Sequence, residues 1–155
     1  MCIRRRLKTG INVDLVTGFD MMKKDQREQV MEYIATRKPF LSTMGPPCTS
    51  SGSWSHLNRK KYRKTLEESR ILGESLANFV VAVAMKQLFC GRHLLIENPR
   101  GSEVFLLPFF QRLWNTGRVC KMHVAQCALG LRVLGEPIRK LTCLLYTSPS
   151  PRDRG

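Results

Sequence analysis

Hydrophobic residues along the chain form short compact runs, separated by longer stretches with helical spacing. Residues 12–18 alternate in polarity and end on a glycine, which predicts a short strand. The apolar runs at residues 40–44, 93–97 and 119–124 predict three more strands. Four strands are therefore predicted across this part of the chain.

Two longer segments between these runs carry apolar residues at every third or fourth position, the spacing of a helix with one buried face. The first is predicted to begin with Asp20 as N-cap. It should end near Arg37, because the following Lys-Pro pair disfavours helical geometry. The second segment, residues 66–89, is the strongest helical pattern in the chain. A capping box of Thr65 and Glu68 is predicted to open it.

Strands and helices alternate along residues 12–124, with a shorter helical segment at residues 102–114 that Pro108 interrupts. This order predicts an α/β fold with a parallel sheet and crossover helices. In such a sheet the carboxyl ends of neighbouring strands open onto one edge, where ligands bind. Gly45-Pro46-Pro47-Cys48 follows one strand and Glu97-Asn98-Pro99 ends the next, so a thiol and a carboxylate are predicted to face one cleft. A nucleophile beside an acid is typical of covalent catalysis.

Basic residues outnumber acidic ones more than two to one: 26 Lys and Arg against 12 Asp and Glu, a formal net charge of +14. This excess favours a polyanionic partner, DNA or RNA, because Lys and Arg neutralise phosphates and release their counterions. The alternative is a basic fragment whose acidic neighbour segments lie elsewhere. A basic run after the cysteine loop is the candidate nucleic-acid-binding segment: Arg59, Lys60, Lys61, Tyr62 and Arg63. A solvated lead-in to the next helix is the alternative for this run.

Cysteine usage and apolar runs bear on the compartment of the protein. The six cysteines include no Cys-x-x-Cys pair, and Cys120, His123 and Cys127 lack the matched second pair of a metal site. Reduced thiols and no metal are therefore predicted. The longest apolar run, residues 79–85, is short for a bilayer span, and no apolar stretch follows the arginines near the N-terminus. A nuclear or cytoplasmic protein without a membrane segment is the resulting expectation.

The two ends of the chain differ in character from its middle. Residues 1–11 are basic without clear periodicity, and we expect an arm or linker there. Residues 143–153 resemble the translation of a sequencing-library adaptor, so residues 143–155 are expected to be an artefactual, disordered tail. Residues 12–142 would then form one incomplete domain.

Five short segments carry the most distinctive residues of the chain: 14–20 (DLVTGFD), 45–49 (GPPCT), 54–58 (WSHLN), 97–102 (ENPRGS) and 127–131 (CALGL). Together they resemble cytosine-C5 methyltransferases, and most closely the divergent methyltransferase-like domains of retroelement polyproteins. The resemblance covers nearly all of residues 12–142. It implies a Rossmann-like class I methyltransferase fold with S-adenosylmethionine as the methyl donor.

By this resemblance Cys48 would add as a thiolate to C6 of a cytosine, while Glu97 would hydrogen-bond the ring near N3. The target base must leave a duplex stack, or be single-stranded already, to reach such a site. The implied catalytic residues are Cys48, Glu97, Asn98 and Arg139, and the candidate cofactor-binding residues are Asp14, Asp20 and Pro46.

Three elements of the family are missing or partial. The glycine-rich cofactor loop would precede residue 12, Thr49 stands where the family has Gln, and residues 135–140 match the arginine element only in part. The chain is therefore predicted to be a methyltransferase-like domain that is inactive as this fragment. The alternative is a non-catalytic nucleic-acid-binding module of a mobile-element polyprotein. A thiol hydrolase using Cys48 with His56 or His93 is weaker, because no third orienting residue is evident.

Overall fold

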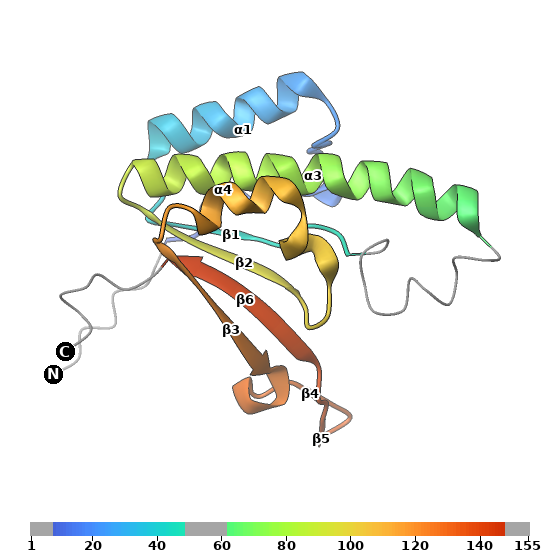
Figure 1. The fold of residues 1–155 in the computed structure, drawn as a ribbon. Helices are drawn as coiled ribbons and strands as arrows, with labels where there is room; N and C mark the ends of the chain where they lie inside the picture. Colours follow the sequence, from blue (N-terminus) through green and yellow to red (C-terminus); the bar gives the residue numbers. More distant parts are fainter. Residues whose placement is uncertain (1–7, 49–61, 148–155) are drawn as a thin grey trace, which may run out of the picture. The chain divides into compact units, whose positions relative to one another are not determined.

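The computed structural model describes residues 8–48 and 62–147 of the chain. The chain divides into two compact units, residues 1–39 and 40–155, and each is described by itself. Figure 1 shows the elements in chain order, from blue at the N-terminus to red near residue 147. The second unit contains every strand of the described residues, together with the Pro-Pro-Cys and Glu-Asn-Pro motifs.

The first unit begins with a 3-10 turn, η1 (Leu15–Thr17), instead of the predicted strand. The Asp14 carboxylate accepts a hydrogen bond from the Val16 N–H at 2.9 Å, and the Thr17 hydroxyl donates to the Asp14 carbonyl at 2.8 Å. The prediction of a strand over residues 12–18 is wrong because these short polar side chains bond to the nearby backbone, which favours a turn.

One helix, α1 (Lys24–Arg37), follows in the same unit. It begins later than predicted, because the Asp20 carboxylate bonds to the Met22 N–H in the preceding turn and Lys23 is the N-cap. Its end is confirmed: Lys38 adopts a left-handed conformation, φ 49°, directly before the proline. The helix thus stops where the Lys-Pro pair indicated.

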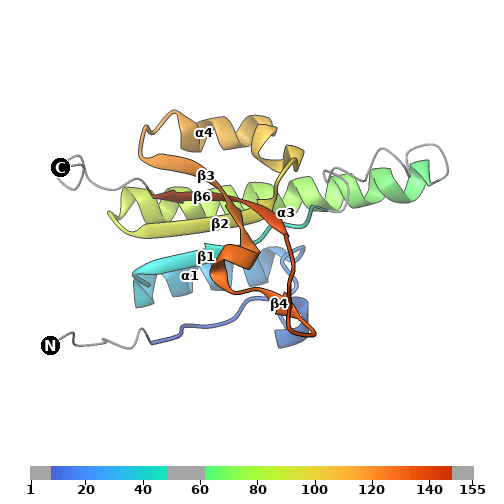
Figure 2. The ribbon, with the colours of Figure 1, turned by 90° about the horizontal axis from the view of Figure 1, so that it is seen from below.

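The second unit is built on a four-stranded sheet in the order β1 (Leu41–Met44), β2 (His93–Pro99), β6 (Leu141–Thr147) and β3 (Val119–Ala125). β1 and β2 are parallel, whereas β6 is antiparallel to both of its neighbours. β1, β2 and β3 therefore run in one direction and β6 runs against them. Figure 2 shows the four strands side by side from below.

The predicted Rossmann-like sheet, parallel throughout and joined by crossover helices, is wrong. Only one hydrogen-bonded pair in the described sheet is parallel, and the sheet is mixed. The reason lies in residues 141–147, which insert as β6 between β2 and β3. Antiparallel pairing of this kind needs no crossover helix, and nothing in the local pattern of a strand sets its direction.

The segment expected to be a disordered tail contributes to this central strand. Cys143 and Leu145 are buried, at 2% and 0% exposure, and they pair with Asn98 and Ile96 of β2. The expected boundary after residue 142 thus falls inside β6, because the compact apolar run at residues 143–146 suits a strand in the middle of a sheet. Residues 148–155 lie outside the described part of the chain.

Helical segments connect the strands. α3 (Arg63–Phe89) joins β1 to β2, and η2 (Glu103–Leu106), η3 (Pro108–Phe110) and α4 (Gln111–Trp114) join β2 to β3. Between β3 and β6 lie η4 (Gln126–Leu129) and a small hairpin of β4 (Arg132–Val133) and β5 (Glu136–Pro137). In Figure 1, α3 and α4 lie on the same face of the sheet.

α3 supplies the largest share of the core. Gly73, Ala77 and Ala84 are buried along it, and such small side chains let a helix approach a sheet closely. The apolar cluster that α3 joins also contains residues of β2, β6 and the short helices η2, η3 and α4. Its buried members are Ala77, Val81, Ala84, Leu88, Leu94, Ile96, Val104, Phe105, Phe110, Leu113, Cys143 and Leu145. Each large aliphatic or aromatic side chain buried there stabilises the fold by roughly 1.5–3 kcal/mol.

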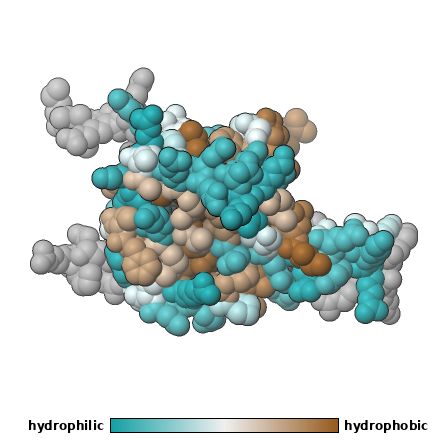
Figure 3. Space-filling model, turned by 90° about the horizontal axis from the view of Figure 1, so that it is seen from above, coloured by the Kyte–Doolittle hydropathy of each residue, from teal (hydrophilic) through white to brown (hydrophobic). Residues whose placement is uncertain are grey.

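Two features of α3 depart from expectation. The helix begins at Arg63 with Tyr62 as its cap and no side-chain cap bond, so the predicted capping box of Thr65 and Glu68 is wrong. Its first turns carry mostly hydrophilic side chains, seen at the right of Figure 3. By length and composition α3 is apolar enough to cross a membrane. The core helix of a soluble protein passes the same test, so this is weak evidence for a span.

The carboxyl end of α3 is held by two arginines. Arg92 donates to the buried Gln87 side chain at 2.6 Å, and Gln87 donates to the His93 carbonyl at 3.1 Å. Arg118 donates to the Leu88 carbonyl at 2.7 Å. Because carbonyls at a helix end lack partners within the helix and the end carries partial negative charge, these cations stabilise it.

Candidate functional site

The two motifs meet at the carboxyl end of the parallel pair. Met44, the last residue of β1, is in register with Ile96, and β2 continues through Asn98. Asn98 is 1% exposed, and its Nδ2 donates to the carbonyl of the buried Pro46 at 2.7 Å. The Pro-Pro-Cys loop is therefore anchored on the Glu-Asn-Pro strand end, as expected for neighbouring parallel strands. The contact joins Asn98 and Pro46, and the catalytic roles of the motifs stay predictions.

Glu97 and Asn98 serve different faces of the sheet. Asn98 pairs with the buried Cys143 and points toward the α3 side, whereas Glu97 pairs with Leu144 and points to the other face. The Asn98 Oδ1 is buried and has no hydrogen-bond partner among the described residues. Asn98 is therefore the residue that holds the loop, and Glu97 is the residue that a ligand can reach.

Glu97 is oriented by side chains from outside both motifs. The Thr142 hydroxyl donates to Glu97 Oε1 at 2.5 Å, and Gln126 Nε2 donates to that hydroxyl at 3.0 Å. Lys140 Nζ lies 3.9 Å from the same oxygen. This chain of contacts, from Gln126 through Thr142 to Glu97, holds the Glu97 side chain in position.

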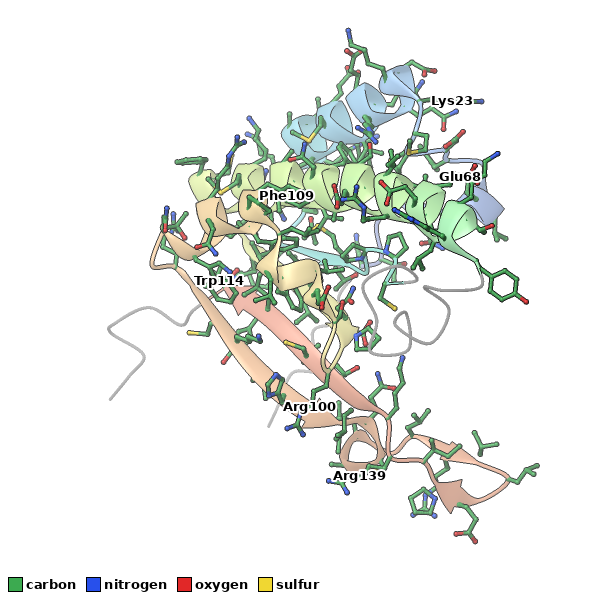
Figure 4. The ribbon with its side chains drawn as sticks, turned by 45° about the vertical axis from the view of Figure 1, so that its right-hand side comes forward. Lys23, Glu68, Arg100, Phe109, Trp114 and Arg139 are labelled. Atoms are coloured by element: carbon green, nitrogen blue, oxygen red, sulfur yellow. The ribbon has the colours of Figure 1, made fainter. Side chains whose placement is uncertain are left out.

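Sequence reasoning missed Gln126, Lys140 and Thr142. Thr142 contacts Glu97 because β6 lies beside β2, and no local sequence pattern predicted that pairing. Lys140, by contrast, belongs to the partial arginine element. The structure places Lys140 near Glu97 and leaves Arg139 exposed. Figure 4 shows Arg139 at the end of the molecule that carries the small hairpin.

The candidate cofactor-binding residues each accept a hydrogen bond from another part of the chain. Asp14 and Asp20 each accept a backbone N–H in their own turn, from Val16 and Met22. The Pro46 carbonyl accepts from Asn98. These bonds hold the segments in which the three residues lie, and the cofactor-binding role of the residues stays a prediction.

The predicted nucleic-acid-binding run is described only in part. Arg59, Lys60 and Lys61 lie outside the described residues. Tyr62 and Arg63 are both exposed at the start of α3. An aromatic and a cation beside each other at a helix start can contact a nucleic-acid strand, and this role stays a prediction.

The cysteines of the described chain are free thiols. Cys48 is half-buried, and no group of three or more His, Cys, Asp or Glu among the described residues is arranged to hold a metal. Burial raises the pKa of the Cys143 thiol above its ordinary value, with a smaller opposing effect of Lys121. Cys48 thus lies two residues after Pro46, whose carbonyl Asn98 holds, and is partly exposed, whereas Cys143 belongs to the core.

Comparison with protein-family models, with curated proteins and with solved structures found no match to this chain. The likeness to cytosine-C5 methyltransferases therefore rests on the motifs alone. A function has to be argued from the charge of the chain and from the geometry at the two strand ends.

Proposed function

We propose that this protein binds nucleic acid and acts on cytosine through a site formed by Cys48 and Glu97. The observation that carries the proposal is the 2.7 Å hydrogen bond from Asn98 to the Pro46 carbonyl. It joins the cysteine loop to the strand end that holds the carboxylate, two segments about fifty residues apart in sequence. A thiol and an acid contributed by these two neighbouring strand ends would suit covalent addition to an electron-poor ring.

The proposed chemistry balances without a cofactor. The Cys48 thiolate forms a bond to C6, and the electrons of the C5–C6 double bond become available at C5, which takes a proton from water. Loss of the original C5 hydrogen as a proton then expels the thiolate and restores the base. The net result is exchange of the C5 hydrogen with solvent.

Glu97 would assist by sharing a proton with N3 of the ring, so that the bond between the carboxyl group and N3 strengthens as the thiolate adds. Its contacts with Thr142 and Lys140 both involve Oε1, so within the described residues Oε2 is left for the base. A pre-oriented carboxylate loses little freedom when a ligand arrives, which favours assistance in the transition state.

Nucleic acid is the proposed partner because of the charge of the chain. A formal net charge of +14 on 155 residues gives a strong long-range attraction to phosphates. The proposed site also needs an unstacked cytosine, so single-stranded nucleic acid is the simplest substrate.

A second candidate is a non-catalytic nucleic-acid-binding module. The observation that favours it is that Asp14, Asp20 and Pro46 each already accept a hydrogen bond that holds a turn or loop of the fold. In this case the two motifs would serve only to fold the sheet edge. Binding of S-adenosylmethionine and chemistry at Cys48 separate the two candidates.

The test is deuterium incorporation at C5 of cytosine in a single-stranded oligonucleotide, incubated with the protein in heavy water and read by mass spectrometry. We expect incorporation by the native chain, none by Cys48→Ala, and a reduced rate with Glu97→Gln. Cys90→Ala is the matched control, since Cys90 is an exposed thiol at the far end of α3. Oligonucleotide binding without any exchange would favour the non-catalytic module.

A further inference from the structure

A cavity of about 330 Å³ lies on the α3 side of the sheet, where β2 ends beside β3 and β6. Arg100 and Ser102, from the turn after β2, line one wall, and Lys121 and His123 of β3 line another. Figure 4 shows Arg100 beyond the end of β2, beside β3. Three basic side chains from two separate segments thus surround one hollow.

Strand alternation explains why the two residues of β3 face the same way. Lys121 and His123 are separated by Met122, which points to the opposite face of the sheet. Lys121 pairs with Leu145 and His123 pairs with Cys143, and both partners are buried on the α3 side. The pairing with β6 therefore fixes both basic residues on the cavity side.

Positive charge in the cavity is not neutralised within the described residues. Arg100, Lys121 and His123 form no ion pair with another described residue, and Glu103 is the one carboxylate of the lining. The buried Cys143 thiol is neutral at ordinary pH, because burial raises its pKa. The balance of charge in the hollow favours an anion.

One wall of the cavity is apolar. Phe105 and Leu106 line it, and the Lys121 ammonium lies 5.9 Å from the centre of the Phe105 ring. A cation over an aromatic face is held in place by attraction to the ring. The cavity thus combines a cation with a surface suited to a flat or apolar group.

We propose that this cavity binds a nucleoside monophosphate, free or at the 5′ end of a strand. Arg100 and Lys121 would make charge-assisted hydrogen bonds to the phosphate, and His123 would add a third donor. The apolar wall would contact the sugar and base, and the volume is near the lower end for ligand pockets, suited to one nucleotide. The lining includes neither Cys48 nor Glu97, so this is a second site.

The test is isothermal titration calorimetry of the full chain with cytidine 5′-monophosphate and with cytidine. We expect the monophosphate to bind and cytidine to show no measurable binding. Lys121→Gln should weaken the monophosphate about tenfold, because it removes one charge-assisted contact. Lys121→Arg should retain most of the affinity. Lys64→Gln, a matched change on the exposed start of α3, should leave it unaltered.

A single-stranded oligonucleotide with and without a 5′ phosphate identifies the source of the ligand. Tighter binding of the phosphorylated strand, abolished by Lys121→Gln, indicates a strand end, and binding of the free monophosphate alone indicates a mononucleotide. Equal binding of monophosphate and cytidine, or equal effects of Lys121→Gln and Lys64→Gln, would overturn the proposal. Cys48→Ala should leave this affinity intact, so failure here and failure of cytosine exchange are separate results.

Discussion

The two halves of the sheet differ in the direction of their strand pairing. In the β1–β2 half, two strands joined by α3 pair in parallel, and their ends meet where their order in the sequence predicted. In the β3–β6 half, a strand from the last part of the chain inserts between β2 and β3 in the opposite direction. The first half follows the strand order that the local pattern predicted, and the second contains a strand that the local pattern did not predict.

The difference matters for the candidate site, because each half supplies part of it. The β1–β2 half contributes Cys48 and Glu97, together with the Asn98 anchor. The β3–β6 half contributes Thr142 and Lys140, which orient the carboxylate. β6, the strand that the local pattern did not predict, therefore supplies the Thr142 hydroxyl that contacts Glu97.

Truncation within β6, compared with truncation just after it, should have the largest effect on stability. A chain ending at Thr142 loses most of β6, which exposes the inner edges of β2 and β3, and we expect no cooperative unfolding transition. A chain ending at Thr147 keeps every β6 pairing and should unfold like the full chain. Thermal unfolding followed by circular dichroism measures both. A stable fold after the first truncation would show that β6 is dispensable.

Two matched leucines compare the halves directly. Leu94 of β2 and Leu145 of β6 are 1% and 0% exposed, and each contributes to the same core. Replacing either with alanine should lower the free energy of unfolding by about 2–5 kcal/mol. Leu134→Ala, at 99% exposure, is the control and should change it little. A small loss for Leu145→Ala beside a large one for Leu94→Ala would mean that β6 packs loosely, contrary to its burial.

The Asn98 anchor should have a moderate effect. Asn98→Ala leaves the buried Pro46 carbonyl without its donor, which should cost about 1–3 kcal/mol of stability. Asn78→Ala, on an exposed position of α3, is the matched control and should cost within about 0.5 kcal/mol. Urea unfolding measures both. Equal stability of the two variants would argue against the bond from Asn98 to the cysteine loop.

The smallest expected effect concerns the Cys143 thiol of β6. Burial raises the pKa of this thiol from its ordinary value of 9.0, so the folded state holds the proton more tightly than the unfolded state does. Its contribution to stability is present below about pH 9 and is lost as pH rises through the folded pKa. Urea unfolding from about pH 8 to about pH 10.5 should show a decline that is shallower in Cys143→Val. The same decline in both would remove the thiol as its cause.

Particular residues show how far sequence reasoning reached. The apolar runs located β1, β2 and β3, and the Lys38-Pro39 pair located the end of α1. The strand predicted at residues 12–18 does not form, because side-chain bonds of Asp14 and Thr17 to the backbone compete with strand formation. Helix α3 was found, but its start was misplaced because neighbouring residues extended it past the expected capping box.

Part of the candidate site was predicted from the sequence, and part was not. Cys48, Glu97 and Asn98 were predicted from strand-end motifs, and the structure joins Asn98 to the carbonyl of Pro46. The catalytic roles of these residues stay predictions. Thr142 and Gln126 could not be found, because their contacts with each other and with Glu97 exist only after β6 has paired. Contacts that depend on strand order are set by the whole sheet, and no window of sequence contains that information.

The central claim is that the two strand ends form one chemical site, and Asn98 tests it most directly. Asn98 is buried and has no part in the proposed chemistry, so it acts only by holding the loop. Cytosine C5 exchange should be lost in Cys48→Ala, slowed in Asn98→Ala and unchanged in Asn78→Ala, all measured where each variant is folded. Exchange by Asn98→Ala at the native rate, or no exchange by the native chain, would contradict the account.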